Sequence, residues 1–307
     1  MTWRAKFSMG GLIGLLAIGV LVGLDALLLH LLLSESIRNQ QISFVTFLLA
    51  LVVLSSIPLL LLAVYHTVSL VTLRYRLDRN GVFVRWLGSG WFGSEQIIPI
   101  RDIQRIISGR ELGGSVVRRH GLRWPGHERG VGMVPGIGRT RFLASQPLEG
   151  QLLLVTPGSA FGISPQDPEG FLRAFGARQE MGPNRLLEQE LRPARWLTWP
   201  LWTDSTAWVL LGVAAFINLG LFGYLAALFP GLDFQLPLHF NSLGQADRIG
   251  IKMELFDLPI IGLIILGTNL ALGLLLYRRE RAGSYLLWGA SAAVQALFWL
   301  AAVSIIP

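Results

Sequence analysis

The stretch that decides how the polar part of the chain folds covers residues 74–86 and reads RYRLDRNGVFVRW. Two short segments, 75–78 and 82–86, flank Arg79-Asn80-Gly81. An Asn-Gly step between two such segments is the strongest short-range signal for a β-hairpin. Two antiparallel strands are therefore predicted here. They open a polar island that extends to about residue 178 and separates two strongly apolar blocks.

More short strands are expected along the island, divided by turn residues, at 94–100, 103–107, 138–145, 151–156 and 160–164. Residues 108–130 are rich in glycine and arginine and show no period, which predicts a long, mobile loop. The glycine runs 88–93 and 130–138 are expected to be turns. Neither run matches a P-loop or a dinucleotide fingerprint, which need a preceding strand and a following helix.

A helix is predicted to close the island. Asp167 fits the N-cap position, Pro168 fits the first helical position, and Glu169 suits the positive end of a helix. Apolar residues then recur at helical spacing, at Phe171, Leu172 and Phe175. Six or seven short strands followed by one helix describe a small barrel or sandwich plugged by that helix.

Three runs within the island carry a family resemblance: RFLAS at 141–145, LLVT at 153–156 and ISPQDPEGF at 163–171. They resemble the bacterial pleckstrin-homology-like (PH-like) domains, which often end on an Ile-Ser-Pro-x-Asp-Pro-x-x-Phe phrase that leads into the C-terminal helix. The resemblance covers about one third of the chain. It implies a β-rich fold with a binding or scaffolding habit, and it does not imply an enzyme.

The rest of the chain has the composition of a membrane protein. Hydrophobic residues make up 52% and charged residues only 15%, whereas soluble domains have about 25% charged residues. A helix needs roughly 20 mainly apolar residues to cross a bilayer. Five stretches meet this requirement, at 8–33, 43–73, 205–229, 257–277 and 283–306. The first apolar run is too long for a cleavable signal peptide, so it is expected to stay as an anchor.

The distribution of positive charge predicts the topology. If the five spans alternate, 23 of the 26 lysines and arginines fall on one side, and such a bias marks the cytoplasmic face. The N-terminus, with Trp3, Arg4 and Lys6 as interfacial anchors, and the central domain are therefore expected inside a bacterial inner membrane, with the C-terminus outside. The net charge of +7 thus indicates topology rather than binding to nucleic acid.

Four regions follow from these observations: an N-terminal transmembrane hairpin at 1–73, a cytoplasmic PH-like domain at 74–178, an amphipathic juxtamembrane linker at 179–204, and a three-span membrane domain at 205–307. In the linker, Asn184 fits the cap of a short helix that carries three leucines. Three tryptophans then gather before the third span, which is typical of a helix at the membrane interface. These residues are Leu186, Leu187, Leu191, Trp196, Trp199 and Trp202.

The extracytoplasmic loop 230–256 carries a second resemblance. Its phrase Pro-x-His-Phe-Asn, followed by Gly-x-x-Asp and then Lys before a span, resembles a domain of unknown function in Sdp-type toxin-immunity and signalling membrane proteins. The matching positions, a candidate ligand or partner surface, are Pro237, His239, Asn241, Gly244, Asp247 and Lys252. Turn-stabilising structure is the alternative. A metal site is disfavoured, because zinc usually takes more nitrogen or sulfur ligands than one imidazole supplies.

Several arginines of the central domain are candidate lipid or phosphate contacts. Each positive charge beside an anionic leaflet can add about 1 kcal/mol of attraction, through specific head-group binding or through generic apposition to the membrane. The candidates in and around the first hairpin and in the long loop are Arg76, Arg79, Arg85, Arg118, Arg119, Arg123 and Arg129.

Polar residues inside the spans are the last group of candidates. Such residues either hydrogen-bond a neighbouring helix or line a pathway. They are Asp25, His30, Asn218, Asn269 and Gln295. The chain has no cysteine, and no catalytic cluster, metal site or cofactor is expected. We therefore expect a binding, scaffolding or regulatory membrane protein whose partners are membrane lipids and other proteins, or a second copy of itself. A transporter or channel component is the alternative, and a membrane enzyme is less favoured.

Overall fold

The computed structural model describes residues 1–39, 42–88, 90–112, 117–120, 124, 126, 128–240 and 246–306. The chain divides into two compact units. The first joins Met1–Gly23 to Ile57–Trp199, and the second joins Leu24–Ser56 to Pro200–Pro307. One end of α1 and one end of α2 lie in the first unit, and the other end of each helix lies in the second.

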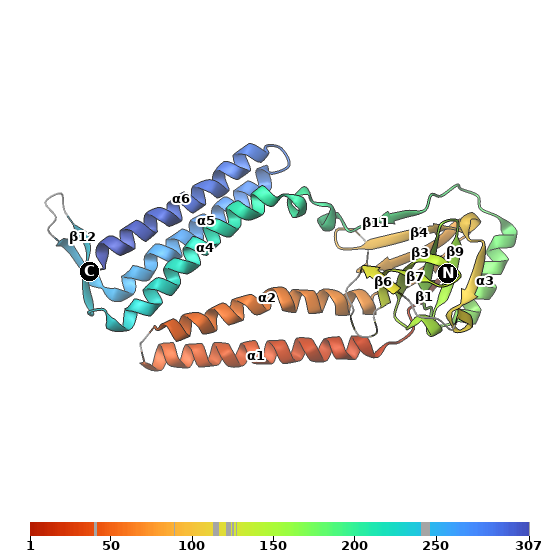
Figure 1. The fold of residues 1–307 in the computed structure, drawn as a ribbon, viewed down its shortest axis with the longest axis horizontal. Helices are drawn as coiled ribbons and strands as arrows, with labels where there is room; N and C mark the ends of the chain where they lie inside the picture. The colour runs from red at the N-terminus through yellow and green to blue at the C-terminus, as the bar shows by residue number, and fades with distance from the viewer. Residues whose placement is uncertain are drawn as a thin grey trace. The chain divides into compact units, whose positions relative to one another are not determined.

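Five of the described helices are long and apolar enough to cross a membrane, which agrees with the five predicted spans. They are α1 (Met9–Asn39), α2 (Phe44–Val71), α4 (Ser205–Leu228), α5 (Asp257–Leu276) and α6 (Arg281–Ile305) (Figure 1). Many of their leucines and valines are exposed in the protein alone, and Leu15 has 61% of its surface accessible. Such surface is stable when lipid tails cover it.

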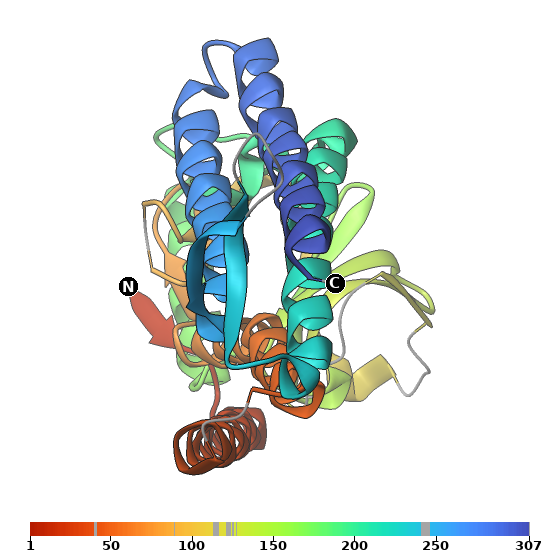
Figure 2. The same ribbon diagram turned by 90° about the vertical axis from the view of Figure 1, so that its left-hand side faces the viewer.

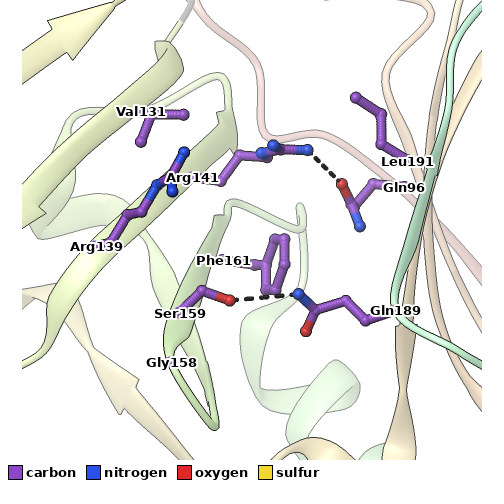
Figure 3. A pocket seen from close by; sticks show the side chains of 9 residues that line it. All are labelled: Gln96, Val131, Arg139, Arg141, Gly158, Ser159, Phe161, Gln189 and Leu191. Carbon is purple, nitrogen blue, oxygen red and sulfur yellow. Dashed lines mark hydrogen bonds between the residues drawn. The ribbon is translucent and has the colours of Figure 1, made fainter.

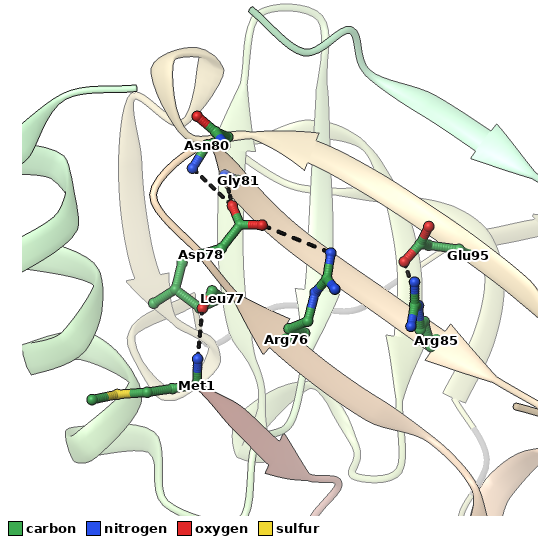
Figure 4. A network of polar contacts seen from close by, with 8 residues as sticks. All are labelled: Met1, Arg76, Leu77, Asp78, Asn80, Gly81, Arg85 and Glu95. Atoms are coloured by element: carbon green, nitrogen blue, oxygen red, sulfur yellow. Dashed lines mark hydrogen bonds and ion pairs between the residues drawn. The ribbon is translucent and has the colours of Figure 1, made fainter. Parts of the chain in front are cut away.

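The first unit contains a five-stranded antiparallel sheet in the order β1-β2-β3-β4-β11. Its strands are β1 (Thr2–Arg4), β2 (Arg74–Leu77), β3 (Gly81–Trp86), β4 (Ser94–Pro99) and β11 (Glu190–Arg192). The hairpin predicted at Asn80-Gly81 joins β2 to β3. Asp78 Oδ1 accepts the backbone N–H groups of Asn80 at 2.8 Å and Gly81 at 3.1 Å (Figure 4), which holds the turn closed.

A second sheet of six strands has the order β5-β9-β10-β8-β7-β6. Its strands are β5 (Arg105–Ser108), β6 (Val117–His120), β7 (Glu128–Val134), β8 (Gly138–Ala144), β9 (Leu152–Thr156) and β10 (Ser159–Ile163). All neighbours are antiparallel except β8 and β10, which run parallel. Short 3₁₀ turns link the strands at η1 (Ile100–Asp102), η2 (Gly109–Leu112) and η3 (Leu148–Gly150).

Helix α3 (Pro168–Met181) closes the core that the two sheets share. As predicted, Asp167 caps it, and its Oδ1 accepts the backbone N–H of Gly170 at 2.9 Å. Phe171 is fully buried and meets Trp3 edge-to-face with the ring centroids 5.2 Å apart. Residues of both sheets complete this core, among them Tyr75, Leu77, Ile98, Leu154 and Ile163.

Strand β1 is not among the strands predicted from the sequence. Trp3 and Arg4, predicted as interfacial anchors, lie in this edge strand, which pairs with β2. Their role as anchors stays a prediction. The next residue, Ala5, donates its backbone N–H to Leu73 O at 3.3 Å and bridges Pro165. The β-domain therefore includes residues that precede the first candidate span. The open edge of β2 supplies the backbone groups that make this pairing favourable.

The predicted loop at 108–130 is corrected. Residues 117–120 within it form β6, and its last residues belong to β7, which covers residues 128–134. The backbone of Gly130 pairs with Phe142 in the ladder, so this glycine lies in a strand and not in a turn. Residues 135–137 do form a turn, as predicted, and Gly136 within it has a φ angle of 76°. Residues 113–116, 121–123, 125 and 127 lie outside the described part of the chain.

The linker does not form the predicted helix after residue 184. Instead, the Oδ1 of Asn80 accepts the backbone N–H groups of Asn184 at 3.1 Å and Arg185 at 3.0 Å. Residues 190–192 then pair with the free edge of β4. The ladder of an existing sheet satisfies their backbone groups, and this outweighs a weak local helix signal. The tryptophans that follow lie in or beside two short 3₁₀ turns, η4 (Arg195–Thr198) and η5 (Pro200–Thr203).

In the second unit, helices α4, α5 and α6 pack side by side (Figure 2). The antiparallel strands β12 (Gln235–Phe240) and β13 (Ala246–Ile251) connect α4 to α5, flanked by the 3₁₀ turns η6 (Phe229–Gly231) and η7 (Lys252–Phe256). At the other end, the carboxylate of Asp204 caps α4 through Ala207 N–H at 3.0 Å. It also accepts hydrogen bonds from Tyr277 and Tyr285, each at 2.5 Å, which ties the three helices together.

Candidate functional site

A polar pocket of about 280 Å³ lies on the β-domain (Figure 3). Strand β8 supplies two arginines to it, and β10 supplies a serine and a phenylalanine. Strand β11 and the residue before it form the facing wall together with β4. The lining residues are Gln96, Val131, Arg139, Arg141, Gly158, Ser159, Phe161, Gln189 and Leu191.

Strand periodicity places both arginines in the pocket. Arg139 and Arg141 are two positions apart on β8, so they face the same side of the sheet. Arg141 lies beside Phe161 in the parallel β8–β10 register. Leu143 continues the same face and is buried in the shared core. The face of β8 that is apolar at Leu143 therefore becomes cationic where it reaches the pocket.

Hydrogen bonds hold Arg141 and the facing wall in place. Arg141 Nη1 donates to Gln96 Oε1 at 2.8 Å, and Gln96 Nε2 donates to the backbone oxygen of Glu190 at 3.0 Å. Gln96 is 2% exposed, so this link is shielded from water. Gln189 Nε2 donates a hydrogen bond to Ser159 Oγ at 3.4 Å (Figure 3). Arg141 and Gln96 are thus held in a defined orientation in the pocket.

The electrostatics of the pocket favour an anion. Burial lowers the pKa of Arg141, and the positive charges of Arg139 and Arg129 lower it further. The lining residues include no aspartate or glutamate, and among the described residues Arg139 forms no ion pair or side-chain hydrogen bond. Arg139 is exposed, whereas Arg141 is half-buried and forms no described ion pair. Burial of a cation without a counter-ion is costly, and an anion bound at Arg141 would reduce that cost. Guanidinium groups match carboxylate and phosphate oxygens geometrically.

Arg129 extends the positive charge on the other side of Arg141. Its guanidinium lies 4.2 Å from the ring centroid of Trp86, and its Nη1 donates to Tyr65 Oη at 3.3 Å. A second, smaller pocket of about 160 Å³ is lined by both Arg129 and Arg141. The three arginines Arg129, Arg139 and Arg141 therefore form one cationic row across β7 and β8.

Three of the arginines predicted from the sequence, Arg76, Arg79 and Arg85, have partners within the domain. Arg76 lies 4.3 Å from the ring centroid of Phe83 and 3.7 Å from a carboxylate oxygen of Asp78. Arg85 forms an ion pair with Glu95 (Figure 4). Arg118 and Arg119 lie on β6, and Arg123 lies outside the described residues. Their predicted role as lipid or phosphate contacts stays a prediction.

Arg79 binds the C-terminal end of α3. Its Nε donates to Gly182 O at 2.5 Å and its Nη2 donates to Met181 O at 2.7 Å. The exposed carbonyls at a helix C-terminus carry a partial negative charge that a cation stabilises.

We expect Arg79→Gln to lower the free energy of unfolding of the β-domain by about 1 kcal/mol, because the charged cap is lost. Thermal unfolding of the full chain in mild detergent measures the change. Arg173→Gln is the matched control, since Arg173 forms only an exposed pair with Glu169 at 3.9 Å, worth at most about 0.5 kcal/mol. Equal losses in the two variants would contradict the capping role.

The predicted partner surface of the loop 230–256 is seen only in part. Lys252 Nζ donates to Phe229 O at 3.0 Å and to Leu232 O at 3.1 Å, so it closes the loop on the end of α4. Pro237 lies on β12 opposite Ile249, and Asp247 lies on β13. His239 also lies on β12. Asn241 and Gly244 are outside the described residues.

Most polar residues of the candidate spans contact a neighbouring helix. Ser56 Oγ donates to Asp25 Oδ2 at 2.7 Å. Asn218 Nδ2 donates to Gln295 Oε1 at 2.9 Å, and Asn269 Nδ2 donates to Ser291 Oγ at 3.0 Å. His30 is exposed on α1. The bonded residues have the contacts expected of helix–helix hydrogen bonding, and the transport alternative stays a prediction.

Sequence reasoning missed Arg139 and Arg141, although a signal was present. The alternation Arg139, Arg141, Leu143 puts both arginines on the face of the strand that also carries a core leucine. A cation at an inward-facing position of a strand is the unusual observation. The facing wall could not be found in this way, because Gln189 and Leu191 reach the pocket only through the pairing of β11 with β4.

Comparison with known proteins identifies the family of the central part of the chain. Residues 73–179 match the family model of the bacterial PH domain. Neither a curated protein nor a solved structure matches the chain. The matched range runs from β2 through α3, so it contains Gln96, Arg139 and Arg141 but neither β1 nor β11. The central part of the chain is therefore a bacterial PH domain by its family match, which confirms the first resemblance, and it accompanies five helices long and apolar enough to cross a membrane.

Proposed function

We propose that the chain is a membrane-anchored binding protein of the scaffolding or regulatory kind, without an enzymatic activity of its own. In this proposal the PH domain binds a partner protein through an acidic segment whose carboxylate enters the pocket at Arg139 and Arg141. One observation carries it: two arginines on one strand face line a polar pocket whose lining residues supply no carboxylate.

The partner is inferred from the wall of the pocket. Strand β11 is the outermost strand of its sheet, and Leu191 on it is 42% exposed. An extended segment that lies along β11 would cover this leucine and bring an acidic side chain to the arginines. Edge strands are regular docking places for extended segments. A protein segment would therefore contact both β11 and the arginines, whereas a small anion would contact the arginines alone.

Two observations support a cytoplasmic PH domain in a bacterial inner membrane. Strand β1 precedes the first candidate span and β2 follows the second, and the two strands are paired. Both ends of the α1–α2 segment therefore lie on one side of the membrane. That side carries 23 of the 26 lysines and arginines if the spans alternate, which favours the cytoplasm.

In this arrangement the β12–β13 hairpin lies outside the cytoplasm. Its resemblance to the Sdp-type membrane proteins rests on Pro237, His239, Asn241, Gly244, Asp247 and Lys252. We include in the proposal that this hairpin is a second surface for a ligand or a partner protein.

The experiment isolates the full chain from its native membrane in mild detergent and identifies co-eluting proteins by quantitative mass spectrometry. We expect a stoichiometric partner with wild type, and at least tenfold less of it with Arg139→Gln. Arg139 is the variant of choice because it makes no described bond to the rest of the domain. The matched control is Arg173→Gln, which removes an exposed arginine of α3 that pairs with Glu169 at 3.9 Å.

Three outcomes would overturn the proposal. The first is a wild-type protein that elutes without a stoichiometric protein partner. The second is equal recovery of the partner with wild type and Arg139→Gln. The third is an equal loss with Arg139→Gln and Arg173→Gln, which would show general dependence on positive charge rather than use of the pocket.

A further inference from the structure

A second crevice lies where the chain leaves the β-domain and enters α1. It has a volume of about 370 Å³. Three cationic side chains, Arg4, Lys6 and Arg74, line one part of it, and apolar side chains that include Leu12, Leu15 and Val71 line the other. We propose that this crevice binds one anionic phospholipid, with its phosphate at the three cations and an acyl chain along the apolar wall.

The charge of the crevice selects an anion. Its lining residues include no aspartate or glutamate. Among the described residues, the side chains of Arg4 and Lys6 form no ion pair, so both are available to a ligand. Arg74 Nη1 donates to Val71 O at 2.9 Å and to Leu73 O at 3.0 Å. These bonds hold one guanidinium at the end of α2, beside the other two cations.

The position of the crevice selects a lipid over a soluble anion. Helix α1 begins at Met9 and is a candidate span from that residue. The cations at Arg4 and Lys6 therefore lie at the level of the lipid head groups, and the apolar wall starts one turn deeper. Leu12, Leu15 and Val71 are each more than half exposed, so this wall needs a cover that a free phosphate cannot provide. Basic pockets beside spans on the cytoplasmic side are typical binding places for anionic lipid head groups.

The backbone that carries the cations is fixed to the β-domain. Gln166 N–H donates to Arg4 O at 2.9 Å, and Lys6 N–H donates to Ser164 O at 2.8 Å. Gln146 Nε2 donates to Phe7 O at 2.7 Å. The segment before α1 is therefore held in place before any ligand arrives. A preformed site loses less conformational entropy on binding, so its affinity is higher.

This inference goes beyond the proposed function, because it concerns a different ligand and residues other than those of the arginine-lined pocket. It also differs from the prediction that Arg76, Arg79 and Arg85 contact lipid, since those arginines have partners within the domain. A bound phospholipid would join the PH domain to the first span at their junction.

The test uses the full chain in nanodiscs of phosphatidylcholine with a minor fraction of phosphatidylglycerol. Native mass spectrometry counts the phospholipid molecules that stay bound. We expect one phosphatidylglycerol to be retained preferentially by wild type, and about 30-fold weaker retention by Arg4→Gln/Lys6→Gln. That factor follows from about 1 kcal/mol for each cation near an anionic lipid and about 1.4 kcal/mol for each tenfold change.

Arg173→Gln/Arg192→Gln is the control with the same change of charge at exposed sites of the β-domain, and it should retain the lipid. Thermal unfolding in pure phosphatidylcholine checks that the variants fold. If the double variant does not fold, the single variants Arg4→Gln and Lys6→Gln replace it, with about fivefold weaker retention expected for each.

Three results would overturn the inference. One is equal retention by wild type and the Arg4/Lys6 variants. Another is retention of phosphatidylcholine as readily as phosphatidylglycerol. A third is displacement of the retained lipid by inorganic phosphate or glycerol phosphate, which would show that the apolar wall takes no part. None of these results depends on partner capture at Arg139, so the two proposals fail separately.

Discussion

Gly262→Leu is expected to abolish the stable packing of α4, α5 and α6. Gly262 lies on α5, and a Cβ added there would clash with Gln295 Oε1 and would lie 2.9 Å from Asn218 Nδ2. Both polar side chains are at most 1% exposed. Gln295 Nε2 also donates to Gly262 O at 2.7 Å, and Asn218 Nδ2 donates to Pro259 O at 2.9 Å. A leucine would therefore break a buried polar network at its centre.

The expected loss is about 3 kcal/mol or more. Overpacking of a closely packed interior costs about 1–3 kcal/mol, and each lost hydrogen bond between membrane helices adds roughly 0.6–1.7 kcal/mol. Small residues at helix contacts allow the close approach that such networks need. Thermal unfolding of the detergent-solubilised chain, followed by tryptophan fluorescence and gel filtration, measures the loss.

Gly267→Leu on the same helix is the matched control. A Cβ at Gly267 would meet no other atom within 4 Å, and leucine favours a helix over glycine by about 1 kcal/mol. The control should therefore unfold at the same temperature as wild type or slightly above it. If the two leucine variants unfold alike, the polar network does not hold the three helices together.

Tyr75→Phe is expected to destabilise the PH domain by about 3 kcal/mol. The hydroxyl of Tyr75 is completely buried. It donates to Leu143 O at 2.8 Å and accepts the backbone N–H of Ser164 at 3.1 Å. Phenylalanine fills the same space but removes both of these buried hydrogen bonds, and loss of a partner for a buried polar group costs about 1–3 kcal/mol. Tyr65→Phe, which removes only a 3.3 Å contact with Arg129, should cost less than about 1 kcal/mol.

The same hydroxyl makes the stability of the PH domain depend on pH in the alkaline range. Burial raises the pKa of Tyr75 from 10.0 to about 12, because phenolate is poorly solvated in the core. The unfolded chain therefore loses this proton more readily than the folded one. The stability that the tyrosine contributes is fully present below pH 10 and is lost as the pH rises toward 12.

Phenylalanine at this position has no proton to lose. The difference in unfolding free energy between wild type and Tyr75→Phe should therefore narrow as the pH rises from 10 to 12. Denaturant titrations of both proteins across this range measure it, and the alkaline titration of every other tyrosine cancels in the difference. A constant difference would show that Tyr75 does not keep its proton in the folded domain.

Features with a local physical cause could be predicted from the sequence. Asn80-Gly81 closes its hairpin because the turn needs only neighbouring residues, and Asp167-Pro168 starts α3 because a cap acts within one turn. The five long helices follow from apolar length alone. The phrase ISPQDPEGF contains the end of one strand, at Ile163, and the start of α3, at Asp167-Pro168. This combination is why the phrase indicated the PH domain.

Features that depend on distant partners could not be predicted. Strands β1, β6 and β11 have three or four residues each, too few to show a period. Their backbone groups are paired only because another sheet edge lies open beside them. Glycine also concealed β7, since Gly130 and Gly132 lack the side chains that indicate a strand. The arginine-lined pocket could not be predicted for the same reason, because β11 forms one of its walls.

Strand β1 has a consequence for the order of synthesis. Thr2–Arg4 leaves the ribosome before either of the first two spans, whereas its partner β2 is made only after both. The edge of β2 is therefore covered only when the hairpin has inserted and returned the chain to its starting side. A nascent protein with one misplaced span would carry a PH domain that lacks a strand and exposes Phe171, which Trp3 otherwise covers. Completion of this sheet therefore requires that the two long helices between β1 and β2 bring the chain back to the side on which it began.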